Sequence, residues 1–136
     1  MRVGSGLTLA IASIALTGQA AAAQDPLARY RQASRVLVLS APDADDRRLA
    51  EQRAAVEAAR AGFGERDLVV VEAVGEGESA AAIRRQLRLP ADAFHAVLVG
   101  KDGGVKITAS DPIPVLRLFS TIDAMPMRRD EMRRQR

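Results

Sequence analysis

Two continuous apolar runs constrain the fold of this chain more than any other feature. Arg35–Ser40 and Asp67–Val74 are each typical of a β-strand buried on both faces of a sheet. The segment between them is rich in alanine, and Leu49, Val56 and Phe63 recur there at seven-residue spacing, which predicts a helix. A helix between two buried strands implies parallel pairing through a right-handed crossover.

The rest of the chain predicts a second helix, a hairpin and a third helix. Phe94–Val99 and Val105–Ala109 are expected strands, and the Asp-Gly pair within Lys101–Gly104 is a strong hairpin signal. One apolar stripe is expected on the helix that follows, formed by Val115, Leu118, Phe119 and Ile122. We expect the first helix to begin at Asp43 or Asp45 and to end at Gly62 or Gly64. The second is expected to begin at Ser79 and to end at Pro90. The third is expected to begin at Asp111-Pro112 and to be interrupted by Pro126.

These elements follow one another in the order βαβαββα, which predicts an α/β sandwich with a mixed four-stranded sheet and flanking helices. This is the thioredoxin-like arrangement. Val36–Pro42 resembles the thioredoxin strand that runs into the active-site turn, and Val97–Val105 resembles the later thioredoxin hairpin. A closer resemblance rests on three strings, Glu65–Val69, Leu98–Lys106 and Ile122–Arg129. Together they resemble the uncharacterised bacterial family called P-DUDES, which is related to domains in vertebrate extracellular sushi-repeat proteins. The resemblance implies a thioredoxin-like fold and leaves the function unassigned.

The first 23 residues read as a cleaved signal peptide. Arg2 supplies a positive start, Val3–Leu16 is mostly apolar, and Ala21–Ala23 offers a small-residue cleavage site. The apolar stretch is too short and too diluted by glycine and serine for a stable membrane anchor. We therefore expect a periplasmic or secreted product. It would consist of a domain over residues 24–126 and a basic C-terminal tail over residues 127–136.

The chain contains no cysteine, so it can neither form nor exchange a disulfide in an oxidising compartment. By the thioredoxin resemblance, Ala44 and Arg47 stand where that family has its cysteines, and its cis-proline would fall near His95. We expect no thiol–disulfide oxidoreductase activity and no cofactor. Any other catalytic activity is left open.

Two groups could form a polar pocket at one sheet edge. His95 is the only histidine and could act as a base or a pH sensor. Asp43, Asp45 and Asp46 could bind a hard cation such as calcium, but Arg48 and Ala54 stand where an EF-hand loop needs glycine and glutamate. Helix capping accounts for the same carboxylates, so no metal site is expected.

The hairpin and the C-terminal string carry most of the other notable residues. Lys101 and Lys106 flank a glycine-rich turn that lacks phosphate-loop spacing and is followed by a strand. Methionines in Met125–Met132 can pack adaptably, and arginines there can clamp an anion. Residues 127–136 hold five arginines against two acids, whereas residues 24–126 sum to −1. The candidate binding residues are Lys101, Lys106, Met127, Arg128, Arg129 and Met132.

We therefore expect a non-catalytic exported domain that binds a protein or an envelope component, and the basic tail favours an acidic partner. The alternative is a ligand-sensing, metal-sensing or hydrolytic protein that uses His95 and Asp43–Asp46. One tyrosine and no tryptophan leave few platforms for stacking bases, so a nucleic-acid partner is not expected. The oligomeric state is left open.

Overall fold

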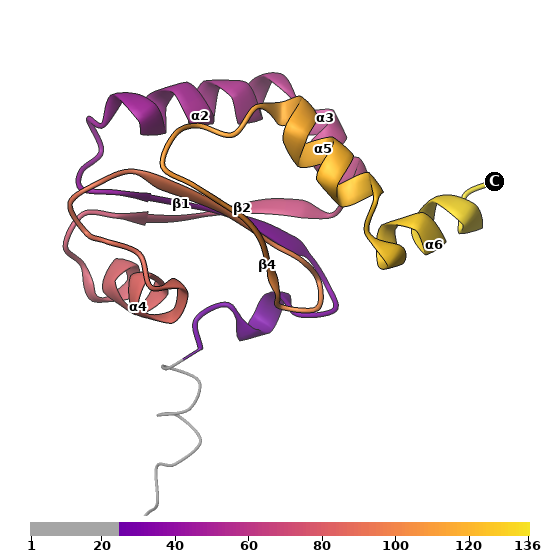
Figure 1. The fold of residues 1–136 in the computed structure, drawn as a ribbon, viewed down its shortest axis with the longest axis horizontal. Coiled ribbons are helices and arrows are strands. Elements are labelled where there is room, and N and C mark those ends of the chain that lie inside the picture. Colours follow the sequence, from indigo (N-terminus) through magenta and orange to yellow (C-terminus); the bar gives the residue numbers. More distant parts are fainter. Residues whose placement is uncertain (1–24) are drawn as a thin grey trace, which may run out of the picture.

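The computed structural model describes residues 25–136, so the predicted signal peptide over residues 1–23 lies outside the described residues. Four strands form one sheet in the order β2-β1-β3-β4 (Figure 1). The parallel pair is β1 (Arg35–Ala41) and β2 (Leu68–Val74), whereas β3 (His95–Val99) and β4 (Val105–Ala109) add antiparallel strands. The mixed four-stranded sheet is thus confirmed.

Strand β1 is the centre of the molecule, and all seven of its residues are buried. Leu37 and Leu39 face the layer of α2 (Arg47–Ala58), α3 (Arg60–Glu65) and α5 (Val115–Asp123). Val36 and Val38 face α4 (Glu78–Leu87) and the 3₁₀ turn η1 (Ala28–Tyr30). Figure 1 shows the two layers on opposite sides of the sheet. A strand covered on both faces needs apolar residues at every position, which explains the continuous run in β1. The same prediction was wrong for β2, because β2 lies at the edge of the sheet, where only Leu68 and Ala73 of the strand are buried and Glu72 is exposed.

The first predicted helix is two helices, and its expected ends were wrong. Asp46 caps α2, because its Oδ1 accepts hydrogen bonds from Arg48 N at 2.9 Å and Leu49 N at 3.1 Å. Asp43 is used in the preceding turn, where its Oδ1 accepts from Asp45 N at 2.9 Å. Gly62 and Gly64 both lie inside α3, and the left-handed residue after that helix is Asp67, with φ of 48°.

Two later helix starts also differ from the prediction. Gly77, not Ser79, is the N-cap of α4, and that helix ends at the left-handed Arg88 before Pro90 is reached. Helix α5 begins after Pro114, so Asp111 and Pro112 precede it. Pro114 disfavours helical geometry at Ile113. Gln52 of α2 also holds both backbone groups of Ile113 in place, with Ile113 N donating to Gln52 Oε1 at 2.6 Å.

Pro126 ends the preceding helix as predicted, and it also begins α6 (Pro126–Arg134), with the proline in the first turn. Figure 1 shows α6 beyond the end of the sheet, following α5. Within residues 25–136, no helix has both the length and the apolar character that crossing a membrane requires.

Candidate functional site

A hydrogen-bonded network of charged side chains joins α6 to the edge of the sheet where β1 begins and β3 ends. Glu131 of α6 accepts hydrogen bonds from Arg35 and Lys101, and Asp123 accepts from Arg66 and Arg128. The network holds four cations, Arg35, Arg66, Lys101 and Arg128, and three carboxylates, Asp67, Asp123 and Glu131. Because the cations are largely buried, their charge is held in a region of reduced dielectric.

Arg35 is the most buried member of this network, with 0% of the residue exposed. Its Nη1 donates to Arg66 O at 2.8 Å and to Glu131 Oε2 at 3.2 Å, and its Nη2 donates to Glu131 Oε1 at 3.2 Å. Its Nε is buried and has no acceptor among the residues that the structure describes. A buried guanidinium N–H without an acceptor is costly, so this atom is a candidate for binding an external group.

Lys101 is committed to internal pairing. Its Nζ donates to Glu131 Oε1 at 2.7 Å and to Asp67 Oδ2 at 2.9 Å, and only 8% of its side chain is exposed. Arg128 is similar, because its Nη1 donates to Glu65 O at 3.0 Å and its Nε to Asp123 Oδ1 at 3.2 Å. Both residues therefore attach α6 and the hairpin to the core, and neither presents a free charge to solvent.

The cations lower the pKa of two carboxylates of the network, Glu131 and Asp123. Partial burial of Glu131 opposes its ionisation, but hydrogen bonds from Lys101 and Arg35 outweigh that effect and lower its pKa. The pKa of Asp123 is lowered in the same way, because hydrogen bonds from Arg66 and Arg128 outweigh its burial. Glu131 and Asp123 are thus ionised near neutral pH.

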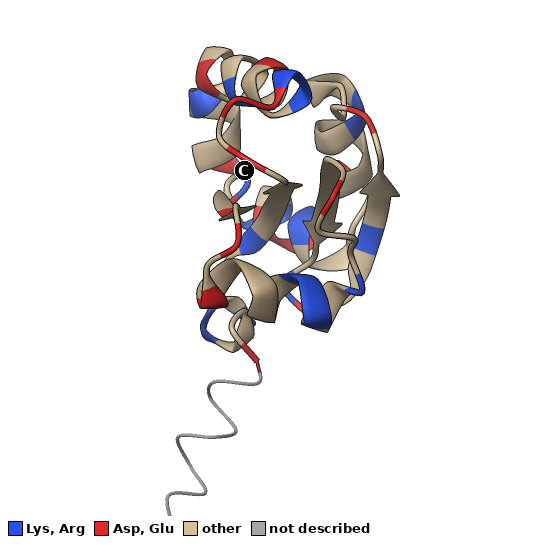
Figure 2. Ribbon diagram, turned by 90° about the vertical axis from the view of Figure 1, so that its left-hand side faces the viewer, with Lys and Arg blue, Asp and Glu red and all other residues tan. Residues whose placement is uncertain are grey.

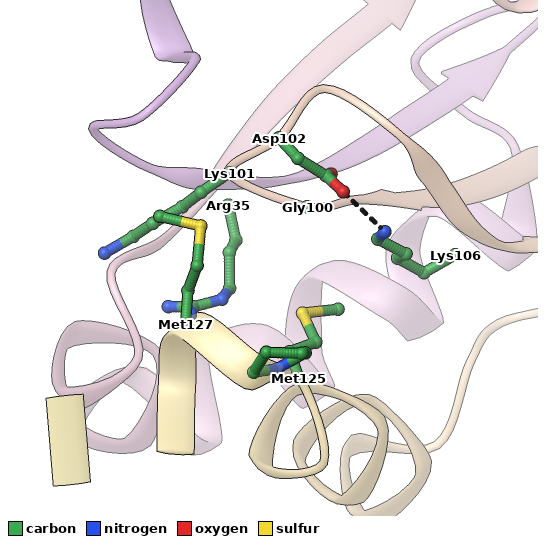
Figure 3. Close-up of a pocket in the computed structure, with 8 residues that line it drawn as sticks. Arg35, Gly100, Lys101, Asp102, Lys106, Met125 and Met127 are labelled. Atoms are coloured by element: carbon green, nitrogen blue, oxygen red, sulfur yellow. Dashed lines mark hydrogen bonds and ion pairs between the residues drawn. The ribbon is translucent and has the colours of Figure 1, made fainter. Parts of the chain in front are cut away.

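A cavity of about 60 Å³ lies between the start of α6 and the β3–β4 turn (Figure 3). The turn contributes Gly100, Lys101 and Asp102, strand β4 contributes Lys106, and β1 contributes Arg35. Its wall on the α6 side consists of Met125, Pro126 and Met127. Figure 3 shows the Arg35 guanidinium beside the Met127 side chain, with Met125 farther to the right, whereas the Lys101 ammonium points away from the methionines. The cavity thus combines apolar walls with a buried cationic group.

The hairpin turn is shaped by Asp102. Its Oδ1 accepts from Gly104 N at 2.9 Å and its Oδ2 accepts from Lys106 Nζ at 2.9 Å. Both hydrogen bonds lower the pKa of Asp102, and the bond from Gly104 has the larger effect. Gly103 has φ of 83°, which glycine adopts without strain. The predicted hairpin is confirmed, and its geometry places the Lys106 ammonium beside the cavity.

The structure brings three of the predicted binding residues, Lys101, Lys106 and Met127, to this one cavity. Arg128 points into the network instead, Arg129 is exposed, and Met132 is half-buried. Sequence reasoning missed Arg35, which it took only as the first residue of a buried strand. A charged residue within such a run was the available signal, because burial of an arginine requires partners.

The second candidate group lies at the opposite edge of the sheet, where β1 ends and β3 begins. A cleft there is lined by Asp46, Asp92 and Asp111 together with Arg48, Ala93, Phe94 and Ser110; His95, Asp43 and Asp45 are not among its lining residues. Arg48 Nε donates to Asp111 at 2.8 Å, and His95 Nδ1 lies 3.4 Å from Ala93 O. The structure therefore does not gather His95 and the three aspartates in this cleft.

Figure 2 looks toward this edge and shows acidic and basic segments interspersed on it. Within residues 25–136, no three histidine, aspartate or glutamate side chains lie close enough to hold one metal ion. Asp46 is used as a helix cap and Asp111 is paired with Arg48, so both have structural roles.

The fold is a mixed α/β sandwich compatible with a thioredoxin-like topology, and it carries a charged network and a small cavity at one sheet edge. The chain belongs to a family described as a domain of unknown function, DUF4174, whose model matches residues 26–131. That match extends through most of α6 and includes Glu131. No solved structure matches this chain.

Proposed function

We propose that this protein is an exported, non-enzymatic binding domain that holds an acidic partner protein on the hairpin–helix surface. This surface consists of the cavity together with Lys106 of β4 and Met127 and Arg129 of α6. The observation that carries the proposal is the cavity itself, whose lining combines a buried cation that has an unpartnered N–H with two methionines. Apolar walls around a few placed polar groups are the usual composition of a binding site.

Exposed apolar side chains support the same surface. Large hydrophobic residues exposed within residues 25–136 are Val105, Leu116 and Met127. Val105 belongs to the hairpin and Met127 to α6, so two of the three lie on the elements that form the cavity. Methionine is adaptable and is enriched at protein interfaces. The surface therefore offers apolar contact area beside the cationic group.

Charge supports an acidic partner. Arg129, Arg133, Arg134 and Arg136 are exposed at the C-terminal end of the chain. Asp130 pairs with Arg133, which leaves an excess of positive charge on this helix. Such a patch would speed encounters with acidic proteins, and its contribution would weaken as salt screens it.

The absence of cysteine supports a binding role over redox chemistry, since no thiol is available to attack a disulfide. We also infer that the family resemblance to P-DUDES and to thioredoxin-like domains reflects a shared fold that here has no thiol site. Export through the N-terminal signal peptide would place this surface in the periplasm or outside the cell.

Photo-crosslinking in the cell tests the proposal. A photoreactive residue is placed at position 127 or 129, and at position 45 as a control, because Asp45 is exposed at the opposite sheet edge. We expect one dominant protein adduct from positions 127 and 129, absent from position 45 and lost when Arg129→Glu is added to the position 127 variant. Equal adducts from position 45, or no adduct from 127 and 129, would refute the proposed surface.

A further inference from the structure

We infer that Arg35 forms a carboxylate slot, in which an aspartate or glutamate side chain of the partner protein would be bound bidentately. The inference deepens the proposed function and rests on it for the source of the carboxylate. It begins from the donors of one guanidinium, which is planar and has five N–H groups in fixed directions.

Three of the five donors are used within the protein. Nη1 uses both of its N–H groups, on Arg66 O and Glu131 Oε2, and Nη2 uses one, on Glu131 Oε1. Glu131 thus occupies the end of the fork formed by the two Nη atoms. The remaining donors are the Nε–H, which has no acceptor in the described part of the chain, and the second Nη2–H. These two lie on the same edge of the fork, which is the other edge that a carboxylate can bind bidentately.

The surroundings of this edge favour a side chain over a bare ion. Arg35 lines the cavity of about 60 Å³ together with Met125, Pro126 and Met127. Figure 3 shows the guanidinium beside the Met127 side chain. A glutamate or aspartate that enters here would place its methylene groups against apolar walls and its carboxylate against Arg35. Met127 is 37% exposed, so this wall of the cavity continues onto the surface of α6.

The charges around Arg35 are balanced within the protein. The network contains four cations and three carboxylates, and Glu65, whose carboxylate lies 3.7 Å from Arg66, compensates the fourth cation. Glu131 is near the slot and would repel a second carboxylate. Its charge is compensated by Lys101, which lies 2.7 Å from a Glu131 oxygen, and by Arg128, which lies 3.8 Å from one. Lys106 adds a cation beside the cavity, although Asp102 shares it. The Arg35 cation in the cavity wall argues against a soft metal ion bound by Met125 and Met127.

The test follows the Arg35 Nε–H resonance by ¹⁵N NMR in the full-length expressed protein. The probes are acetyl-Gly-Glu-Gly-amide, its Gln counterpart as a neutral control, and sodium acetate, all at one ionic strength. We expect the Glu peptide to shift this resonance saturably and the Gln peptide to leave it unchanged. Because the methylenes of glutamate contact the methionines, the Glu peptide should bind at least about threefold tighter than acetate.

A matched pair of variants locates the site. Met127→Asp places a competing carboxylate at the mouth of the cavity and should weaken Glu-peptide binding by about tenfold. Leu116→Asp makes the same change in charge at a residue of α5 that is 83% exposed and outside the cavity, and it should leave binding unchanged. Both substitutions are at exposed positions, so neither should prevent folding.

Several outcomes would overturn the slot: no saturable shift, an equal shift with the Gln peptide, or equal weakening by the two variants. Acetate that binds as tightly as the Glu peptide would overturn the assignment to a partner's side chain, and would indicate a free small carboxylate. A crosslinked partner without an NMR response would preserve the proposed function and remove the slot. An NMR response without a crosslinked partner would preserve the carboxylate slot and remove the proposed partner-binding function.

Discussion

Glu131 of α6 accepts two hydrogen bonds from Arg35, the first residue of β1, although 96 positions separate them in the chain. Both donor–acceptor distances are 3.2 Å, and the Arg35 side chain is 1% exposed. Lys101 at the hairpin donates to the same carboxylate. The last helix is therefore attached to the sheet mainly through a charged network, and the predictions below begin from it.

Removing the carboxylate should be costly. Glu131→Gln would leave Arg35 and Lys101 buried with one compensating charge fewer. Breaking a fully buried pair costs about 3–5 kcal/mol, and because Glu131 is 20% exposed we expect a loss of about 2–3 kcal/mol. Urea unfolding measures this loss in the free energy of unfolding. Asp130→Asn is the matched control, because Asp130 pairs with an exposed arginine, and it should cost no more than about 1 kcal/mol. Equal losses from both variants would contradict this account of α6.

Stability should fall in acid. The pKa values of Glu131 and Asp123 are lowered in the folded protein from ordinary values of 4.5 and 3.8. A carboxylate with a lowered folded pKa contributes stability above its unfolded pKa, and that stability is lost as the pH falls through the folded pKa. We expect the free energy of unfolding to be level near neutral pH and to decline below about pH 4.5. The decline should be shallower in Glu131→Gln, and an unchanged slope in that variant would contradict the assignment.

Arg84 holds the ends of β1 and β2 together from α4. Its guanidinium donates to Ser40 Oγ at 3.0 Å, Gly75 O at 2.7 Å, and the carbonyls of Ala41 and Ala73 at 2.8 Å each. Arg84→Met would leave buried carbonyls without donors and should cost about 3 kcal/mol.

The neighbouring Arg85→Met is the control for that change, since Arg85 is exposed and, within residues 25–136, pairs only with the exposed Glu78. It should alter the free energy of unfolding by no more than about 0.5 kcal/mol. Thermal or urea unfolding of the two variants should therefore differ clearly, and similar curves would show that Arg84 is not required to join the strand ends.

Two glycines of α3 should respond oppositely to alanine. A Cβ at Gly62 would lie 2.6 Å from the ring of Phe119, which is held by Phe63 at 5.7 Å and by the Arg66 guanidinium at 3.9 Å. Gly62→Ala should therefore destabilise the protein by about 1–3 kcal/mol. A Cβ at Gly64 meets nothing within 4 Å, so Gly64→Ala should stabilise it by about 0.5–1 kcal/mol. Unfolding curves with the same sign of change would contradict the packing of Phe119.

Export is tested by the mass of the accumulated protein. Cleavage after Ala23 should leave a chain that begins at Gln24 and is recovered from the periplasm or the medium. Replacing Ala21 and Ala23 by bulky residues should block processing. A full-length chain that remains in the cytoplasm would refute the predicted signal peptide.

Local patterns in the sequence determined the strands, the hairpin and the apolar stripe of α5. Burial in a sheet, burial of one helix face and turn geometry each select the types of residues that are neighbours in the chain. Leu118 and Ile122 are fully buried as that stripe predicts. The helix ends were less determined. Three aspartates near the start of α2 were all able to cap it, and only the backbone path decided for Asp46.

The candidate site was decided by tertiary structure. Lys101, Lys106 and Met127 were visible in the sequence as a basic hairpin and a methionine-rich string, and the resemblance to a family of unknown function pointed to the same strings. Nothing local indicated that Arg128 would be buried. The place of Arg35 in an apolar run indicated its burial, but not that some of its donors would stay open. Those roles depend on the meeting of β1, the hairpin and α6. Chain neighbours do not encode which distant charges will pair, because a buried ion pair is specified only when packing brings its partners together.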